Sequence, residues 1–387
     1  MKATKWKSYS LALIAGMSVL TACSSDDNND NGGNGNNGNG NEIENGTTLK
    51  GTITSDVTLT AGSTYKLSGE YIVEDGATLN IEAGVKIISI YDDIVDYILV
   101  KQGGKINAVG TSSAPIVMTS EKEEPGAWGG IHICGKAHTN AEGGKGSSEI
   151  GGATYGGNDD ADNSGTLKYV RVEYSGYAFD SEHEANGITF YGVGNGTTVE
   201  YCQAYKGSDD GFEFFGGSVN VSNLVSVSCS DDSFDWTEGW NGTATNLVAY
   251  QEAEETLGYD CDCLIEADNN ENNYAATPVA HPVLKNLILV GNNSAAGNRG
   301  IRLRRGTQVE IDGAKVCGKK NAVTLESEET ENALLAGTSK LANMTVDSEL
   351  RSEKNIYTND NFVSAGNTVD TLSLIHISEP TRQEAIS

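Results

Sequence analysis

Carboxylates recur at one fixed offset, beside aromatic residues, in two neighbouring segments of the chain. The first segment reads DDGFEF, and the second, which begins 22 residues later, reads DDSFDW. Together they supply six candidate metal ligands: Asp209, Asp210, Glu213, Asp231, Asp232 and Asp235. Because Ca²⁺ takes about six to eight oxygen ligands from flexible turns, this pattern predicts a Ca²⁺ site that joins neighbouring repeats. The alternative is that Asp-Gly and Asp-Ser only form turns and their charge is solvated.

The same acids are also candidates for catalysis. Two carboxylates about 5 Å apart serve as nucleophile and acid in retaining glycosidases, and wider pairs act in inverting ones. Glu213 and Asp235 are the candidates for such a pair. A β-elimination lyase instead needs a base near a cation, and Arg302 or Arg304 in the segment RGIRLRR is a candidate for that base. The simpler interpretation of these arginines is a solvated basic face that balances acidic neighbours.

Aromatic residues near the acids indicate a third possibility, a carbohydrate-binding groove. Tyr191, Phe215 and Trp240 are candidates to stack on sugar rings, with Arg302 and Arg304 as further ligand contacts. Stacking on exposed rings requires no acid–base pair, so a glycan-binding or adhesion module is the first functional hypothesis. A polysaccharide lyase or glycoside hydrolase is the alternative, and an inert structural stalk is the second alternative.

The elements that hold these residues are short strands that recur along the chain. The segments GITF, GFEF and SFDW follow one another at steps of 24 and 22 residues, and we expect DCLI to continue the series with Leu264 in the outward column. Alternation of apolar residues with a period of two indicates half-buried strands, and a repeat in the low twenties indicates a solenoid. Helical periodicity is absent after residue 50, so we predict an all-β chain.

A second series, about ten residues after the first, carries a polar residue at a fixed place. Its members are Asn223, Asn246, Asn286, Asp312 and Asn343. Buried Asn side chains at one place in successive coils satisfy one another by stacking their amides. We therefore interpret them as a structural ladder and not as ligands.

Several segments together resemble a group of Bacteroidota surface lipoproteins that carry a pectin-lyase-like β-helix. They read GATLNIEAGVKI, GGKINAVGTSSAPIVMTS, GAWGGIHICGKA and GSDDGFEFFGG. The resemblance implies a single right-handed parallel β-helix, which we assign to residues 49–371 with an insertion at 138–165. It is specific for architecture, since this fold hosts lyases, hydrolases, adhesins and stalks. The Asp-Asp pair is similar to that of polygalacturonases, but their Gly-His-Gly motif is absent.

The N-terminal residues resemble a bacterial lipoprotein signal, although an ordinary secretory signal is the alternative. Three lysines precede an apolar run that is too short to span a membrane, and the run ends in LTAC. The resemblance implies removal of residues 1–22, attachment of lipid such as palmitate at Cys23, and export to the surface of the outer membrane. Residues 23–48 are rich in Asn, Gly and Asp, and their composition predicts a flexible tether.

The charge of the chain limits its partners. It has 54 acidic against 26 basic residues and a formal net charge of −28, which excludes nucleic acid because phosphate binding needs a basic face. This balance suits cations and neutral or basic ligands, whereas a uronate-rich glycan would need local Arg or Ca²⁺. Residues 372–387 resemble a translated sequencing adapter, and we exclude them from the fold prediction.

Overall fold

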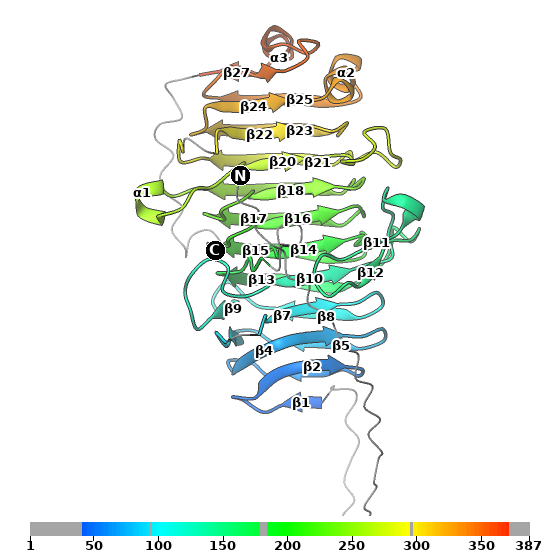
Figure 1. Cartoon of the computed structure of the whole chain (residues 1–387), viewed down its shortest axis with the longest axis vertical. Helices are drawn as coiled ribbons and strands as arrows, with labels where there is room; N and C mark the ends of the chain where they lie inside the picture. The colour runs from blue at the N-terminus through cyan, green and yellow to red at the C-terminus, as the bar shows by residue number, and fades with distance from the viewer. Residues whose placement is uncertain (1–40, 93, 179–183, 295–296, 371–387) are drawn as a thin grey trace, which may run out of the picture. The chain divides into compact units, whose positions relative to one another are not determined.

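The computed structural model describes residues 41–92, 94–178, 184–294 and 297–370. Its strands stack in parallel from β1 at one end to β27 at the other, which confirms the predicted right-handed parallel β-helix (Figure 1). The first strand begins at Asn41, before the expected start at residue 49. The proposed lipidation site Cys23 and residues 371–387 lie outside the described residues.

Strand pairing divides the β-helix into three faces, which we call A, B and C. Face A carries the candidate site, and the ends of β2 (Thr48–Ile53) and β4 (Thr64–Val73) begin it. Its further strands are β7 (Tyr97–Val100), β10 (Ile131–Cys134), β14 (Ile188–Tyr191), β16 (Phe212–Phe215), β18 (Phe234–Thr237), β20 (Ile265–Ala267), β22 (Arg299–Leu303), β24 (Asn321–Leu325) and β26 (Arg351–Ser352).

Faces B and C are made of separate strands at first and of long bent strands later. Face B begins with β1 (Asn41–Ile43), β3 (Val57–Leu59), β5 (Thr78–Ile81) and β8 (Lys105–Val109). Face C begins with the first halves of β2 and β4, followed by β6 (Lys86–Ser89) and β9 (Ile116–Ser120). Strands that then serve both faces are β13 (Gly165–Glu173), β15 (Thr198–Tyr205), β17 (Asn220–Val227), β19 (Thr243–Tyr250), β21 (Val283–Val290), β23 (Glu310–Cys317) and β25 (Lys340–Val346). The last strand, β27 (Thr368–Val369), pairs with β25.

A residue in the left-handed backbone region bends each long strand where face B meets face C. These residues are Tyr169, Tyr201, Asn223, Asn246, Asn286, Gly313 and Asn343. The Asn246 amide donates to Asn223 Oδ1 at 2.9 Å, and the Asn286 amide donates to Asn246 Oδ1 at 3.2 Å. The predicted Asn ladder is therefore present, but the expectation that it is buried was wrong, because Asn246, Asn286 and Asn343 are exposed. Asn suits this position because it tolerates the left-handed backbone conformation. On the β23 coil the bend is Gly313, and Asp312 precedes it.

Stacked rings fill the interior behind face A. The alternating pattern of the short strands turns every second side chain inward, and neighbouring coils bring like residues together. The rings of Phe190 and Phe214 lie 5.1 Å apart, and those of Phe212 and Phe234 lie 5.5 Å apart. This continuous core fixes the register that places the acids on the outer side of the same strands.

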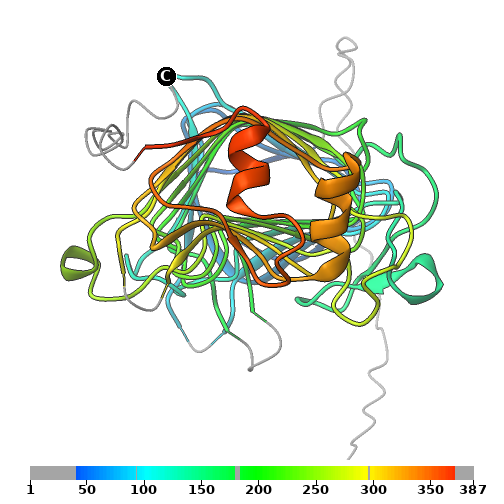
Figure 2. The same ribbon diagram turned by 90° about the horizontal axis from the view of Figure 1, so that it is seen from above.

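Helices are present despite the absence of helical periodicity in the sequence. They are α1 (Glu254–Leu257), α2 (Glu328–Ala336) and α3 (Asn359–Ser364), and η1 (Glu142–Gly144) is a 3-10 turn. Looking down the β-helix, Figure 2 shows α3 across its end, where the buried Phe362 joins the core. None of the helices in the described parts of the chain is long and apolar enough to cross a membrane.

The insertion between β10 and β13 folds over part of face A. It contains η1 and a two-stranded hairpin of β11 (Gly146–Ser147) and β12 (Thr154–Tyr155). Ile150 and Tyr155 of this insertion form a second apolar cluster with Leu99 and Tyr191 on the outer side of face A. The insertion therefore becomes one wall of the candidate site.

Candidate functional site

All six predicted acids lie together on face A. Glu213 on β16 and Asp235 on β18 are register partners in neighbouring coils, and the two Asp pairs lie in the turns that precede these strands. The six line one cavity of about 370 Å³ together with Asn186, Glu149, Glu184, Asp262 and Glu266. Carboxylate oxygens of Asp210, Glu213 and Asp235 lie within 4.8 Å of one another, which is close enough for one cation to contact all three.

The next coil follows a register that differs from the predicted one. Asp235 pairs with Glu266 and Trp236 pairs with Ala267, so Glu266, and not Leu264, continues the outward column. The predicted alignment of this coil with the preceding one was wrong by two residues. The inward positions here are Ile265 and Ala267, and because Ala267 is small, the apolar alternation at this point is weaker than in the neighbouring coils. Glu266 and Asp268 were consequently missed as neighbours of the predicted acids.

Two further acids come from outside the repeat. Glu149 belongs to the insertion, and Glu184 belongs to the segment that precedes β14. Carboxylate oxygens of Glu184, Asp209 and Asp231 form a second close group within 4.8 Å. No periodic signal marks Glu149 or Glu184, so only the folded chain reveals that they reach this cavity.

Some of the acids also hold the turns of the β-helix together. The Asp232 backbone N–H donates to Asp210 Oδ1 at 2.8 Å, and the Cys263 backbone N–H donates to Asp232 Oδ1 at 2.6 Å. The side-chain amide of Asn186 donates to Glu213 Oε2 at 2.5 Å. The turn interpretation therefore accounts for one oxygen of Asp210 and one of Asp232, and it leaves the other oxygens of these acids for a ligand.

Burial and mutual repulsion make these carboxylates unusually weak acids. Burial is the largest cause and neighbouring carboxylates add to it, so the pKa values of Asp209, Asp210, Glu213, Asp232 and Asp235 lie well above their ordinary range. Asp231 is the most exposed of the six, and partial desolvation together with the neighbouring carboxylates of Asp262 and Glu266 raises its pKa to about 6. Asp235 Oδ1 is buried and forms no hydrogen bond with the described residues. Protons or a bound cation must therefore compensate the charge of this cluster.

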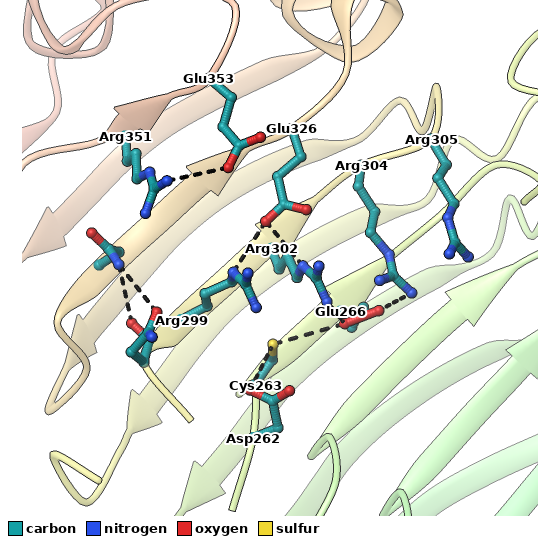
Figure 3. Close-up of polar contacts among 12 residues, drawn as sticks. Asp262, Cys263, Glu266, Arg299, Arg302, Arg304, Arg305, Glu326, Arg351 and Glu353 are labelled. Atoms are coloured by element: carbon teal, nitrogen blue, oxygen red, sulfur yellow. Dashed lines mark hydrogen bonds and ion pairs between the residues drawn. The ribbon is translucent and has the colours of Figure 1, made fainter. Parts of the chain in front are cut away.

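Arg302 on β22 and Arg304 directly after this strand form ion pairs with acids at the far side of the cluster (Figure 3). Arg302 lies between Glu266, at 2.6 Å, and Glu326, at 3.0 Å. Arg304 pairs with Glu266 and, at 2.7 Å, with Asp268. Although burial alone lowers the pKa of each guanidinium, the ion pairs raise both pKa values, so both groups remain protonated. The hypothesis that Arg302 or Arg304 acts as a catalytic base is therefore set aside.

Two of the three predicted stacking residues are not accessible to a ligand. Tyr191 is 0 % exposed beneath the insertion, and Trp240 is 1 % exposed in the core, where its ring stacks on Phe214 at 4.1 Å. The expectation that these two rings bind sugar was therefore wrong. Phe215 is half-buried, and its ring stacks on Tyr191 at 4.7 Å. Of the three, Phe215 alone lines the cavities around the site.

A larger groove of about 700 Å³ continues from the acid cluster along face A. Glu149, Glu213, Asp235 and Arg304 line both the groove and the smaller cavity, so the two are continuous. The remaining lining residues are Phe215, Thr237, Glu238, Asp268, Asn270, Glu271, Asn272 and Arg305. The groove is thus polar, with one half-buried aromatic ring in its wall.

Comparison with models of known protein families gives a match over most of the chain. The sequence model of a family described as pectate-lyase like beta helix domain matches residues 51–379, a range that includes every strand of the site. No curated protein and no solved structure gives a match.

Proposed function

The chain belongs to the family of pectate-lyase-like β-helix domains, and from this premise we propose that it is a Ca²⁺-dependent glycan-binding or adhesion module. One observation supports the proposal above the others. Six carboxylates from two neighbouring coils meet in an open cavity, with raised pKa values and with one buried oxygen, Asp235 Oδ1, that has no partner among the described residues. A divalent cation satisfies that arrangement, because it replaces several protons at once.

The cation is proposed to lie between Asp210, Glu213 and Asp235. Their oxygens are close together, and all of them are hard ligands of the kind that Ca²⁺ prefers. Glu266 is a poorer ligand, since Arg302 and Arg304 already neutralise it. Because Asp210 and Glu213 belong to one coil and Asp235 to the next, the bound ion would join the two coils.

The groove supports a glycan as the ligand. It is about 700 Å³ in volume, which is within the usual range of ligand sites, and polar side chains make up most of its wall. A sugar chain offers many hydroxyl groups to such a wall, and the ring of Phe215 offers an apolar contact. The continuity of the groove with the acid cluster allows a bound cation to contact the same ligand.

A glycoside hydrolase or polysaccharide lyase is the second candidate. Glu213 and Asp235 are partners on strands that lie about 4.8 Å apart, which is near the carboxyl spacing of retaining glycosidases. The raised pKa of each carboxyl suits a proton donor.

A structural stalk is the third candidate, and it predicts neither binding nor turnover.

An oligosaccharide array separates these candidates. We expect the protein to bind in millimolar Ca²⁺ and to lose binding in chelator, without release of reducing ends or unsaturated products. Asp235→Asn should abolish binding, whereas Glu255→Gln, which alters an exposed acid on α1, should not. Product release would instead identify an enzyme, and no binding under any condition would favour the stalk.

The location of the protein is a separate proposal that rests on the N-terminal sequence. We propose that lipid on Cys23 anchors the protein in the outer membrane with the β-helix exposed at the cell surface. Cys23→Ser should yield a soluble or unprocessed protein, whereas the wild type should partition into detergent. Protection of the wild type from protease on intact cells, under conditions that cleave surface controls, would contradict surface exposure.

A further inference from the structure

The turn that follows the strands of face A has a left-handed backbone in several coils. Gly192, Gly216 and Glu238 directly follow β14, β16 and β18 at equivalent positions, with φ values of 56°, 63° and 53°. Arg305, two residues after the end of β22, occupies the same position with a φ of 46°, whereas Asn269 of the β20 coil between them has no positive φ. Glycine adopts this conformation without steric cost, whereas a side chain there is strained. Gly is therefore the residue that the turn itself favours, and Glu238 and Arg305 depart from it.

Strained side chains of this kind concentrate at functional sites, and both of these side chains line the groove of about 700 Å³. Arg305 is already engaged, because its guanidinium pairs with Asp268 at 2.8 Å. Glu238 is positioned differently. The Thr139 hydroxyl donates to Glu238 Oε2 at 2.6 Å and the Tyr155 hydroxyl donates to the same oxygen at 2.8 Å.

These two hydrogen bonds fix the direction of the Glu238 carboxylate. Both donors belong to the insertion, and burial raises the pKa of Tyr155, so its hydroxyl remains a donor. Oε1 forms no hydrogen bond within the parts of the chain that the structure describes, and it is therefore available to a ligand in the groove. The hydrogen bonds from Thr139 and Tyr155 hold the insertion against Glu238, and they use only Oε2. They do not explain why a second carboxylate oxygen, Oε1, lies beside the groove.

The charge around Glu238 restricts the ligand further. Glu149, Asp235 and Glu271 line the same groove, and its two arginines are already paired with acids: Arg304 with Glu266 and Asp268, and Arg305 with Asp268 and, at 3.7 Å, with Glu271. An anionic sugar would be repelled by this wall unless a cation bound it. A neutral sugar donates its hydroxyls to carboxylates without that penalty, and such charge-assisted hydrogen bonds are the strong ones.

We infer that Glu238 is a specificity-determining residue that accepts hydrogen bonds from the hydroxyls of a neutral sugar unit, beside the ring of Phe215. This inference rests on the proposed glycan-binding function and adds the class of sugar and the residue that selects it. The subsite lies beyond the cation position, so sugar selection and Ca²⁺ binding should respond to different substitutions.

The test uses the whole protein on an array of neutral hexose chains, N-acetylhexosamine chains and uronate chains in millimolar Ca²⁺. The tightest neutral chain is then titrated by calorimetry against wild type, Glu238→Gln, Glu238→Gly and the control Glu255→Gln, which alters an exposed acid on α1, outside the groove. Gln keeps an oxygen for Thr139 and Tyr155, and Gly is the residue that earlier coils use at this turn, so both variants should fold. Ca²⁺ binding is measured separately for each variant.

We expect wild type to prefer neutral chains and both Glu238 variants to bind them about 10- to 100-fold more weakly, as for loss of a hydrogen bond to a charged group. The sugar affinity of Glu255→Gln and the Ca²⁺ affinity of all variants should change little. Preference for uronate chains, or Glu238 variants with wild-type affinity, would overturn the inference and leave the proposed function intact. Absence of any glycan binding by wild type would refute both.

Discussion

The carboxylate of Asp210 accepts a hydrogen bond from the backbone N–H of Asp232 in the next coil, at 2.8 Å. Asp232 repeats the contact with Cys263 at 2.6 Å, so each Asp caps the turn that follows it in the stack. Both residues line the cavity of the proposed cation site, and Asp210 is one of its three proposed ligands. One set of acids thus serves both the fold and the site, and the two roles respond differently to substitution.

Asp232→Ala should destabilise the cation-free protein by about 1–3 kcal/mol, because the Cys263 amide loses its buried acceptor. Asp232→Asn should lower the free energy of unfolding by less than Asp232→Ala, or should raise it. The Asn side-chain oxygen still accepts the hydrogen bond from Cys263, and repulsion from the neighbouring carboxylates is relieved. Urea unfolding in chelator at neutral pH measures both variants. Equal losses for Ala and Asn would contradict the capping role.

The cation-free protein should lose stability as pH rises from about 4 through 6 and beyond. Burial and repulsion raise the folded pKa values of the site acids, including Asp231 to about 6, above the ordinary Asp value of 3.8. The folded state therefore binds more protons than the unfolded state in this window, and the free energy of unfolding falls with rising pH. The window begins near pH 4, where the same acids ionise in the unfolded chain. Two kinds of group oppose the trend: Asp160 and Glu331 below the window, because hydrogen bonds outweigh burial and lower their pKa values, and His132 within it, because burial lowers its pKa to about 4. The six site acids outnumber His132 in the window.

Denaturant unfolding in chelator across this pH range measures the effect. Millimolar Ca²⁺ should reduce or reverse the fall, since the cation replaces the protons. A free energy of unfolding that stays constant or increases from pH 4 to 7 in chelator would show that burial and repulsion do not raise the pKa values of these acids in the folded state.

Asn246→Leu should destabilise the protein by about 1–3 kcal/mol, because Leu pays the left-handed backbone penalty and loses the amide contacts to Asn223 and Asn286. Asn246→Gly should cost less, since Gly adopts that backbone without strain. Thermal unfolding of the two variants is the measurement. A Gly variant as unstable as the Leu variant would assign the whole effect to the amide ladder.

The sequence predicts the repeat well where coils are short and regular. The steps between GITF, GFEF and SFDW place Glu213 beside Asp235, as strand pairing has them. The excursion that contains α1 interrupts this regularity before β20, and two alignments of DCLIEAD are then compatible with apolar alternation. The structure selects the one that brings Glu266 beside Asp235.

Other features depend on contacts that alternation cannot encode. Glu149 and Tyr155 reach the site only because the insertion folds back over face A. Trp240 lies after the end of β18, so strand alternation does not predict whether its side chain points inward or outward. In the structure its ring points into the core and stacks on Phe214. The Asn series was recognised from its spacing, but exposure depends on which side of the bend the amides occupy.

Differential scanning calorimetry in millimolar Ca²⁺ and in chelator measures whether the acid cluster binds Ca²⁺. We expect a higher melting temperature with Ca²⁺, since an ion that binds only the folded state adds about 2.7 kcal/mol at 100 times its dissociation constant. Glu213→Gln combined with Asp235→Asn should remove the difference, and Glu255→Gln should retain it. Equal melting temperatures of the wild type in Ca²⁺ and in chelator would contradict binding of Ca²⁺ to the acid cluster.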